Sequence, residues 1–376
     1  MPSAERASAA LLRELGGAIH RGSGQPAGTC PSEFWDAGGV ANPPYCYSAV
    51  MHCANPTTTP DLDFIYSYDK PAAPLSGSIV FLPGSGGTLG KLVGDGQFVQ
   101  DYFNDSYEVI QVAWQTDWQQ TSDPLALMTA AGRPAGFLNY VLNTPLLNAR
   151  STIPTAGLCA QAVSAGSGGA GYALAWYADS AGNYLNADLD NVELMSGPVF
   201  ANVEAGCMVI SPSLTAAQTI CPAGQYGCSP GTTTWQNPEP YVPVDAQQVR
   251  AWTNDNTCAN AMQTSSTSNQ NWLAMSIVNG SGGNFTYSNL GMAGWVCATS
   301  TSCSLPNCPN NSAAEGEFFY TLFTSGSHPA GYKLTGITSC ENAEGVAQGT
   351  DPDTGQPGWK AIEGHMTTQC THPSPR

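Results

Sequence analysis

The chain has 376 residues, enough for one large domain or two ordinary ones, and its 42% hydrophobic and 10% charged residues exclude an intrinsically disordered polymer. Eleven basic residues against 28 acidic ones give a formal net charge of -17, which disfavours binding to nucleic-acid phosphates or anionic lipid headgroups. No apolar run approaches the about 20 residues of a membrane-spanning helix. We therefore expect a soluble globular protein that binds neither nucleic acid nor a membrane.

The 13 cysteines, together with only four lysines, predict a secreted protein. The first 20 residues lack the apolar stretch of an export signal, so we expect that signal to be missing from this sequence. No tight Cys-x-x-Cys pair is present, so disulfides are expected rather than a zinc site. The odd total leaves at least one thiol without an intrachain partner, and Cys159, in a predicted buried strand, is the candidate. The groupings that suit disulfides are Cys46/Cys53, Cys221/Cys228, Cys297/Cys303/Cys308 and Cys340/Cys370.

Residues 1–55 combine a short amphipathic helix with a stretch rich in glycine, proline and cysteine. We expect this segment to be an N-terminal extension wrapped onto a main domain of residues 56–376. From residue 61 onward, predicted strands and helices alternate, which is typical of an α/β fold with a mostly parallel central sheet flanked by helices. The first strands of this pattern are predicted at residues 63–68, 77–82, 107–114, 157–162 and 191–195, and the first helices at 125–142 and 168–178.

The alternation stops after Pro198, where a segment rich in cysteine, proline, glycine and tryptophan is too long for an ordinary connection. We expect it to form a disulfide-rich lid inserted at about residues 207–270. The pattern then resumes, with strands predicted at 272–278 and 332–338 and helices at 317–324 and 359–370.

A serine among small residues follows the strand predicted at 157–162, in the sequence Gln-Ala-Val-Ser-Ala-Gly-Ser-Gly-Gly. Ala162 and Gly166 stand two residues before and after Ser164, which permits a sharp strand-to-helix turn that exposes the hydroxyl. The backbone N–H groups at such a helix start favour the negative charge that develops in acyl transfer. Ser167 is framed in the same way and competes with Ser164. A turn that only packs closely is the alternative without chemistry, and the absence of a Gly-Lys-Ser/Thr pattern disfavours a phosphate site.

These features resemble the α/β-hydrolase superfamily, whose esterases often carry Gly-x-Ser-Ala-Gly. Ala162 replaces the first glycine of that motif here. The resemblance favours Ser164 as the nucleophile, because the family's turn begins the helix directly after the serine.

The resemblance also assigns a role to the glycine-rich loop that follows the strand at 77–82, in the sequence Pro-Gly-Ser-Gly-Gly-Thr. In the superfamily the equivalent loop donates a main-chain N–H to the oxyanion. It implies one oxyanion donor from Ser85 or Gly86 and the other from Ala165.

A serine hydroxyl needs a base to act as a nucleophile near neutral pH, and histidine has the suitable pKa. The superfamily places the base after the last strand, which favours His365. His328, which precedes that strand, is the alternative.

The acid that orients the base most often follows the strand after the lid, but no Asp or Glu occurs between Asn256 and Ala314. Some members of the superfamily carry the acid one strand earlier, which points to Glu204. Asn284 could orient the imidazole through a neutral hydrogen bond instead. The carboxylates beyond the final strand, Glu341 and Glu344, stay open as well.

Trp114 and Trp118, at the end of the strand predicted at 107–114, are candidates for stacking against substrate. The sequence thus predicts a secreted serine hydrolase that cleaves small-molecule or polymeric carboxylic esters through an acyl-enzyme, without a cofactor or metal. One alternative is a non-catalytic α/β-hydrolase-like protein that binds carbohydrate or another small ligand. The other is an amide or peptide hydrolase that uses the same residues.

Overall fold

The computed structural model describes residues 25–26, 30, 34, 46–51, 61–72, 74–84, 87, 96–116, 118, 126–177, 185–195, 290–297, 333–340 and 345–373. These residues include the strands β1 (Gln25–Pro26), β2 (Cys46–Met51), β3 (Leu62–Asp69), β4 (Gly77–Leu82), β5 (Tyr107–Trp114), β6 (Gly157–Val163), β7 (Asn191–Met195), β8 (Gly291–Cys297) and β9 (Lys333–Ile337). The helices are α2 (Gly96–Asn104), α3 (Ala126–Asn143), α4 (Ala165–Trp176) and α11 (Gly358–Gln369), with short 3-10 turns at Ala149–Ser151 and Leu185–Ala187.

The nine described strands form one sheet in the order β1-β2-β3-β5-β4-β6-β7-β8-β9. From β5 to β9 all neighbours are parallel, whereas β1, β2 and β3 extend the sheet with antiparallel pairings. Every residue of β4, β5, β6 and β7 is buried, as expected for parallel strands that are covered on both faces. The predicted α/β class with a mostly parallel sheet is confirmed.

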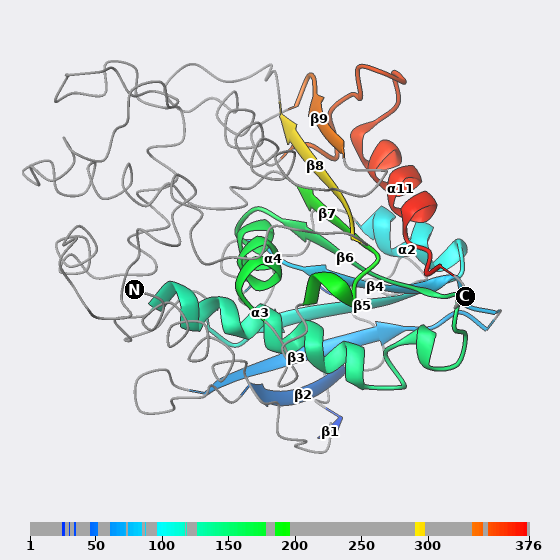
Figure 1. Ribbon diagram of the computed structural model, residues 1–376. Coiled ribbons are helices and arrows are strands. Elements are labelled where there is room, and N and C mark those ends of the chain that lie inside the picture. The colour runs from blue at the N-terminus through cyan, green and yellow to red at the C-terminus, as the bar shows by residue number, and fades with distance from the viewer. Residues whose placement is uncertain are drawn as a thin grey trace, which may run out of the picture.

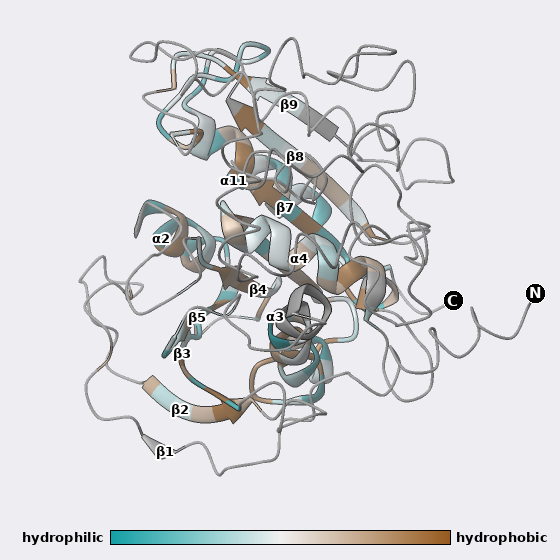
Figure 2. Cartoon of the chain, turned by 90° about the vertical axis from the view of Figure 1, so that its left-hand side faces the viewer, coloured by the Kyte–Doolittle hydropathy of each residue, from teal (hydrophilic) through white to brown (hydrophobic). Residues whose placement is uncertain are grey.

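Helices cover the sheet on both faces (Figure 1): α3 and α4 pack together on one face, and α2 and α11 lie side by side on the other. Each face has its own buried apolar cluster, because successive residues of a strand point to opposite faces. Leu158 and Ala160 of β6 point toward α3 and α4, while Cys159 and Val163 point toward α2 and α11. Both α2 and α11 carry polar as well as apolar residues (Figure 2).

Several predicted boundaries agree with the structure. The strands predicted at 77–82, 107–114 and 191–195 coincide with β4, β5 and β7, and the last predicted helix is α11 within one residue at each end. Among the described strands and α-helices, four were missed: β1, β2, α2 and β8. The lid, the amphipathic helix near the N-terminus, the strand predicted at 272–278 and the helix predicted at 317–324 lie outside the described residues.

The predicted N-terminal extension contains part of the main sheet. β2 pairs along its whole length with β3, although it falls within residues 1–55. A disulfide joins Cys46 in β2 to Cys30, so the predicted grouping of Cys46 with Cys53 is wrong.

A second disulfide joins Cys159 in β6 to Cys370 at the end of α11. Two predictions are therefore wrong: Cys159 is not the free thiol, and Cys370 is not bonded to Cys340, which is itself disulfide-bonded. The sequence could not predict this pairing, because the two cysteines are 211 positions apart and only the fold brings them together.

Among the helices that the structure describes, none has the length and apolar character required to cross a membrane.

Candidate active site

Ser164 occupies a strained turn between β6 and α4. Its backbone angles, φ 51° and ψ -125°, lie in a region that side-chain-bearing residues rarely adopt. Such a conformation costs of order 1–3 kcal/mol and persists only where the surrounding structure enforces it. The strain is the property expected of a serine at a sharp strand-to-helix turn.

The same turn brings Ser164 to the protein surface. From residue 156 to residue 175 every residue is buried except Ser164, which is partly exposed. A chain that leaves a buried strand and enters a buried helix thus presents one side chain, the serine, at the point where it reverses direction.

Glycines allow the backbone after β4 to approach this turn closely. A Cβ added at Gly84 would lie 2.9 Å from Cβ of Ser164, and one added at Gly166 would lie 2.4 Å from the carbonyl oxygen of Leu82. Gly87 closes a tight turn by donating its N–H to the Gly84 oxygen at 2.8 Å, with φ +71°. The loop that carries Ser85 and Gly86 therefore starts beside Ser164, although those two residues lie outside the described part of the chain.

Ala165 is the first residue of α4 and is buried directly behind the serine. Its N–H belongs to the helix start, whose unpaired amides and dipole favour negative charge. No acidic residue stands in the first turn of α4 to oppose that field. The turn can therefore stabilise an oxyanion next to Ser164.

The competing serine has a different environment. Ser167 is fully buried within α4, and its hydroxyl donates to the carbonyl oxygens of Met195 at 3.0 Å and Ala162 at 3.1 Å. A hydroxyl that is inaccessible and already bonded to backbone oxygens cannot reach a substrate. The geometry supports Ser164, not Ser167, as the candidate nucleophile.

The two tryptophans expected to contact substrate are buried in the apolar cluster under α3 and α4. The indole of Trp114 packs against Phe64 and Phe137, and it lies so close to Gly87 that an added Cβ there would be 2.4 Å from the ring. Trp118 packs against Gly169 of α4. The expected substrate-stacking role is therefore corrected: these rings support the glycine loop and the helix from inside.

The expected base, His365, lies in an interior cluster between α11 and the sheet. Its Nδ1 is 2.6 Å from Oε1 of Glu193, a fully buried carboxylate in the middle of β7. Asn191 donates to the same oxygen at 2.7 Å, and the indole N–H of Trp295 donates to the other oxygen. The imidazole also makes an edge contact with the Trp295 ring.

A neighbouring buried contact joins α2 to β6. The Tyr102 hydroxyl donates to Oε1 of Gln161 at 2.6 Å, and Gln161 is the cross-strand partner of Glu193. Burial, followed by the negative charge of Glu193, raises the pKa of Tyr102 well above its ordinary value, so the phenol remains a hydrogen-bond donor.

The position of His365 along the sheet follows from the position of its partner, Glu193. Helix α11 ends over the starts of β5 and β6, because Tyr107 donates to the carbonyl of Cys370 at 3.3 Å and Cys370 is bonded to Cys159. Glu193, the partner of His365, is level with Gln161, and Ser164 follows three residues later, which is about 10 Å at ~3.3 Å per strand residue. The partner of His365 therefore lies well before Ser164 along the strands, and the role of His365 as the base stays a prediction.

The remaining candidates are not placed by the structure. His328, the alternative base, and the candidate orienting groups Glu204, Asn284, Glu341 and Glu344 lie outside the described residues. Glu193 was missed at the sequence level, although a carboxylate within the apolar strand Asn-Val-Glu-Leu-Met was a signal for a buried partner of opposite charge.

No protein-family model and no curated protein matches the sequence. Among solved structures, the chain is similar to the carboxylesterase EstE1 from a metagenomic library, with a TM-score of 0.43, 11% identity and coverage of 98% of this chain and 95% of that chain. It is similar to the esterase Est2 of Thermogutta terrifontis, with a TM-score of 0.43, 10% identity and coverage of 80% and 86%. It is also similar to a carboxyl esterase of the fungus Tuber melanosporum, with a TM-score of 0.43, 10% identity and coverage of 84% and 85%.

Proposed function

We propose that this protein is a serine hydrolase that cleaves carboxylic esters through an acyl-enzyme formed on Ser164. One observation carries the proposal: the serine has φ 51° and ψ -125° between a buried parallel strand and a buried helix, and it alone is partly exposed there. Exposure and strain at one serine indicate a positioned nucleophile, because packing by itself would be served by glycine or alanine.

The chemistry begins with attack of the Ser164 oxygen on the ester carbonyl. The carbonyl oxygen becomes negative, and the N–H of Ala165 together with an N–H from Ser85 or Gly86 would stabilise it. The closeness of Gly84 to Ser164 supports the second donor. The alcohol leaves, and water then releases the acid from the acyl-enzyme.

We propose His328 as the base. The two histidines that the structure describes are both paired with carboxylates, His365 with Glu193 and His372 with Asp190, and Glu193 is level with Gln161, three residues before Ser164. His328 is the remaining candidate, because His20 and His52 precede the sheet strands that build the turn.

Two carboxylates are candidates to orient the base. Glu204 follows β7 in the sequence, at the position that some members of the superfamily use. The structure adds a second candidate, because the strand that follows β7 in the sheet is β8 (Gly291–Cys297) and ends at residue 297, not near residue 278 as the sequence predicted. The first carboxylate after β8 in the sequence is Glu315, which joins Glu204 as a proposed orienting acid.

We further propose that the protein works in an oxidising, extracellular environment. The disulfides Cys30–Cys46 and Cys159–Cys370 support this, since such bonds persist in secreted proteins and are rare in reducing compartments.

The proposal is tested with p-nitrophenyl butyrate and a fluorophosphonate probe. The wild-type protein should hydrolyse the ester and be labelled at Ser164, identified by peptide mass spectrometry. Ser164→Ala should lower kcat by at least about 10³-fold and abolish labelling with an unchanged circular-dichroism spectrum, because the nucleophile is lost and the fold is kept. A folded wild-type protein that neither turns over esters nor reacts with the probe would instead favour a binding protein.

A further inference from the structure

We infer that Ser167 is a positioning residue for the nucleophile: its buried hydroxyl ties the first turn of α4 to the ends of β6 and β7, and thereby sets the direction of the Ser164 side chain. This inference rests on the proposed role of Ser164 and assigns a function to the second serine of the motif.

The bonding pattern around the turn supports the inference. The main-chain N–H of Ser164 donates to the Met195 oxygen at 2.8 Å, and the hydroxyl of Ser167 shares that acceptor at 3.0 Å. The same hydroxyl lies 3.1 Å from the carbonyl oxygen of Ala162, two residues before the nucleophile, and the main-chain N–H of Ser167 donates to the main-chain carbonyl oxygen of Ser164 at 2.9 Å. Ser167 thus binds the chain before the turn, the turn itself and the neighbouring strand.

The start of α4 offers little else to hold the turn in a strained conformation. From Ala165 to Gly171 the sequence is Ala-Gly-Ser-Gly-Gly-Ala-Gly, so Ser167 has the sole polar side chain in the first two turns. Each glycine lowers intrinsic helix stability by roughly 1 kcal/mol relative to alanine, and Ser164 makes no side-chain cap bond to the helix. The van der Waals contacts of glycine and alanine have little directionality. The hydrogen bonding of the Ser167 hydroxyl to the carbonyl oxygens of Ala162 and Met195, in contrast, fixes the position of the helix start relative to the strands.

The glycines at the start of α4 are required for close packing, which is a different role from that of Ser167. Gly166 lies against the backbone of Leu82 and Pro83, and Gly169 lies against Trp118, so larger side chains would push α4 away from the sheet. Ser167 is fully buried among these contacts. Burying a hydroxyl costs free energy unless it is hydrogen-bonded, so alanine would serve better than serine if this residue only filled space.

The test compares Ser167→Ala, which removes one oxygen and adds no volume, with the wild-type protein in ester hydrolysis and in the rate of fluorophosphonate labelling. We expect kcat and the labelling rate to fall about 10- to 100-fold with KM within about twofold, because a small misdirection of a nucleophile lowers the rate of reaction more than binding. Ser167→Cys, a weaker donor of similar shape, should give intermediate values.

Ser78→Ala is the matched control. Ser78 is equally buried, accepts from the Ala149 N–H at 2.9 Å and donates to Glu108 at 3.2 Å, but it pairs with Leu158 at the other end of the strands, six residues before Ser164. It should lower the melting temperature without changing kcat or the labelling rate.

The outcomes separate the two hypotheses. Wild-type kcat and labelling in Ser167→Ala, with only a lower melting temperature, would overturn the positioning role and leave the proposed function intact. A wild-type protein that does not react at Ser164 would overturn both. If Ser167→Ala fails to fold, a Ser167→Cys variant with unchanged labelling rate would overturn the inference, and a slower rate would support it.

Discussion

His365 of α11 and Glu193 of β7 form an interior pair that links the helix to the sheet. The carboxylate is completely buried in β7, where an isolated charge would be costly, and the imidazole, with 13% of its side chain exposed, lies 2.6 Å from it. Removing one member of such a pair leaves the other buried without its partner. The pair therefore belongs to the attachment of α11 to the sheet.

This assignment makes a prediction at the residue scale. His365→Gln should lower the free energy of unfolding by about 2–5 kcal/mol, yet leave kcat per folded molecule within about twofold. His328→Gln should have the opposite effect, with a normal melting temperature and kcat reduced at least about 10³-fold, because the proposed base is lost. Thermal melts and active-site-normalised kcat check both variants. Inactivation by His365→Gln in a folded protein would restore His365 as the base.

Parts of the residue-scale assignment could be read from the sequence. Ser164 was predicted because small residues on both sides of a serine after a buried strand permit the sharp turn that exposes a nucleophile. Its preference over Ser167 needed the burial of the second hydroxyl, since both serines have the same local spacing. The pairing of His365 with Glu193 could not be read from the sequence, because chain order does not reveal how far along a strand a helix residue lies.

At the scale of elements, α11 is held to the rest of the fold by ionisable groups as well as apolar contacts. Burial, followed by the negative charges of Asp101 in α2 and Asp105 directly after α2, raises the pKa of Glu363 to about 7, against a smaller opposing effect of Lys360. A protonated Glu363 can donate to Asp105, whereas an ionised one repels both aspartates. The contact between α11 and α2 therefore depends on pH.

The sign of that dependence follows from linkage. A carboxyl whose pKa is higher in the folded protein contributes stability that is fully present below its ordinary pKa of about 4.5 and is lost as the pH rises through about 7. Amide hydrogen exchange in α11, corrected for its intrinsic pH dependence, should accelerate between pH 4.5 and about pH 7, the window between those two pKa values. Glu363→Gln should remove this acceleration.

Glu108 provides the control for this prediction, because burial also raises its pKa to about 7. It lies near the start of β5, against Ser78 and Lys70, on the face of the sheet opposite to α11. Glu108→Gln should flatten the pH dependence of global unfolding and leave the exchange of α11 as pH-dependent as in the wild-type protein. Equal exchange in α11 at both pH values in the wild-type protein would contradict the proposed role of Glu363.

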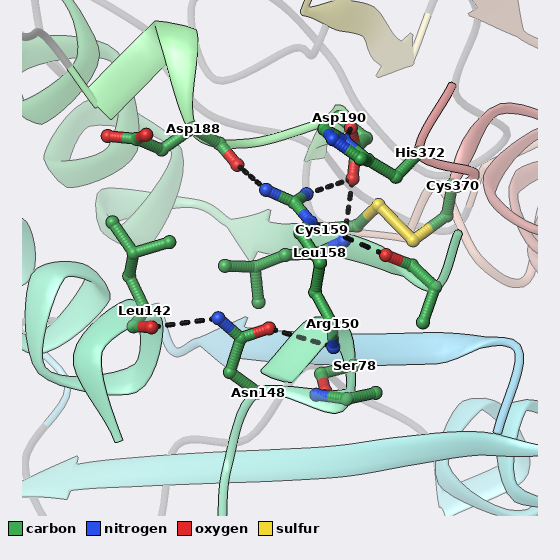
Figure 3. Close-up of polar contacts among 12 residues, drawn as sticks. Ser78, Leu142, Asn148, Arg150, Leu158, Cys159, Asp188, Asp190, Cys370 and His372 are labelled. Atoms are coloured by element: carbon green, nitrogen blue, oxygen red, sulfur yellow. Dashed lines mark hydrogen bonds and ion pairs between the residues drawn. A yellow bond between two sulfur atoms is a disulfide. The ribbon is translucent and has the colours of Figure 1, made fainter. Parts of the chain in front are cut away.

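At the scale of the whole molecule, the C-terminal segment is attached to the sheet at the N-terminal ends of the parallel strands. Asp190 lies at the centre of this attachment (Figure 3): its carboxylate accepts from Arg150, from the Leu158 N–H at 2.8 Å, and contacts His372 at 2.8 Å. The Cys159–Cys370 disulfide lies next to these contacts and closes a loop of the chain between residues 211 positions apart.

Because this attachment lies at the opposite end of β6 from Ser164, it is expected to affect stability and not chemistry. Replacing both Cys159 and Cys370 by alanine should lower the free energy of unfolding by about 2–5 kcal/mol, since the closed loop restricts the unfolded chain. The labelling rate of Ser164 well below the melting temperature should not change. Denaturant melts and probe kinetics measure the two effects.

The disulfide between Cys30 and Cys46 is the matched control, because it spans only 16 residues at the edge of the sheet. Its removal should cost less stability on the loop-closure argument. A loss of labelling rate in the Cys159/Cys370 variant while it remains folded would show that the end of α11 influences the nucleophile, despite their separation along β6.

The sequence by itself determined the alternation of strands and helices, the strands β4, β5 and β7, and the serine turn, because these depend on local hydrophobic patterns and on the steric demands of small residues. The tertiary structure decided which serine is exposed, that Trp114 and Trp118 are internal supports, and that Cys159 bonds to Cys370. It also decided that His365 pairs with Glu193. These outcomes depend on which segments, distant in the sequence, come into contact and on how far along a strand they meet. Local sequence patterns contain neither kind of information.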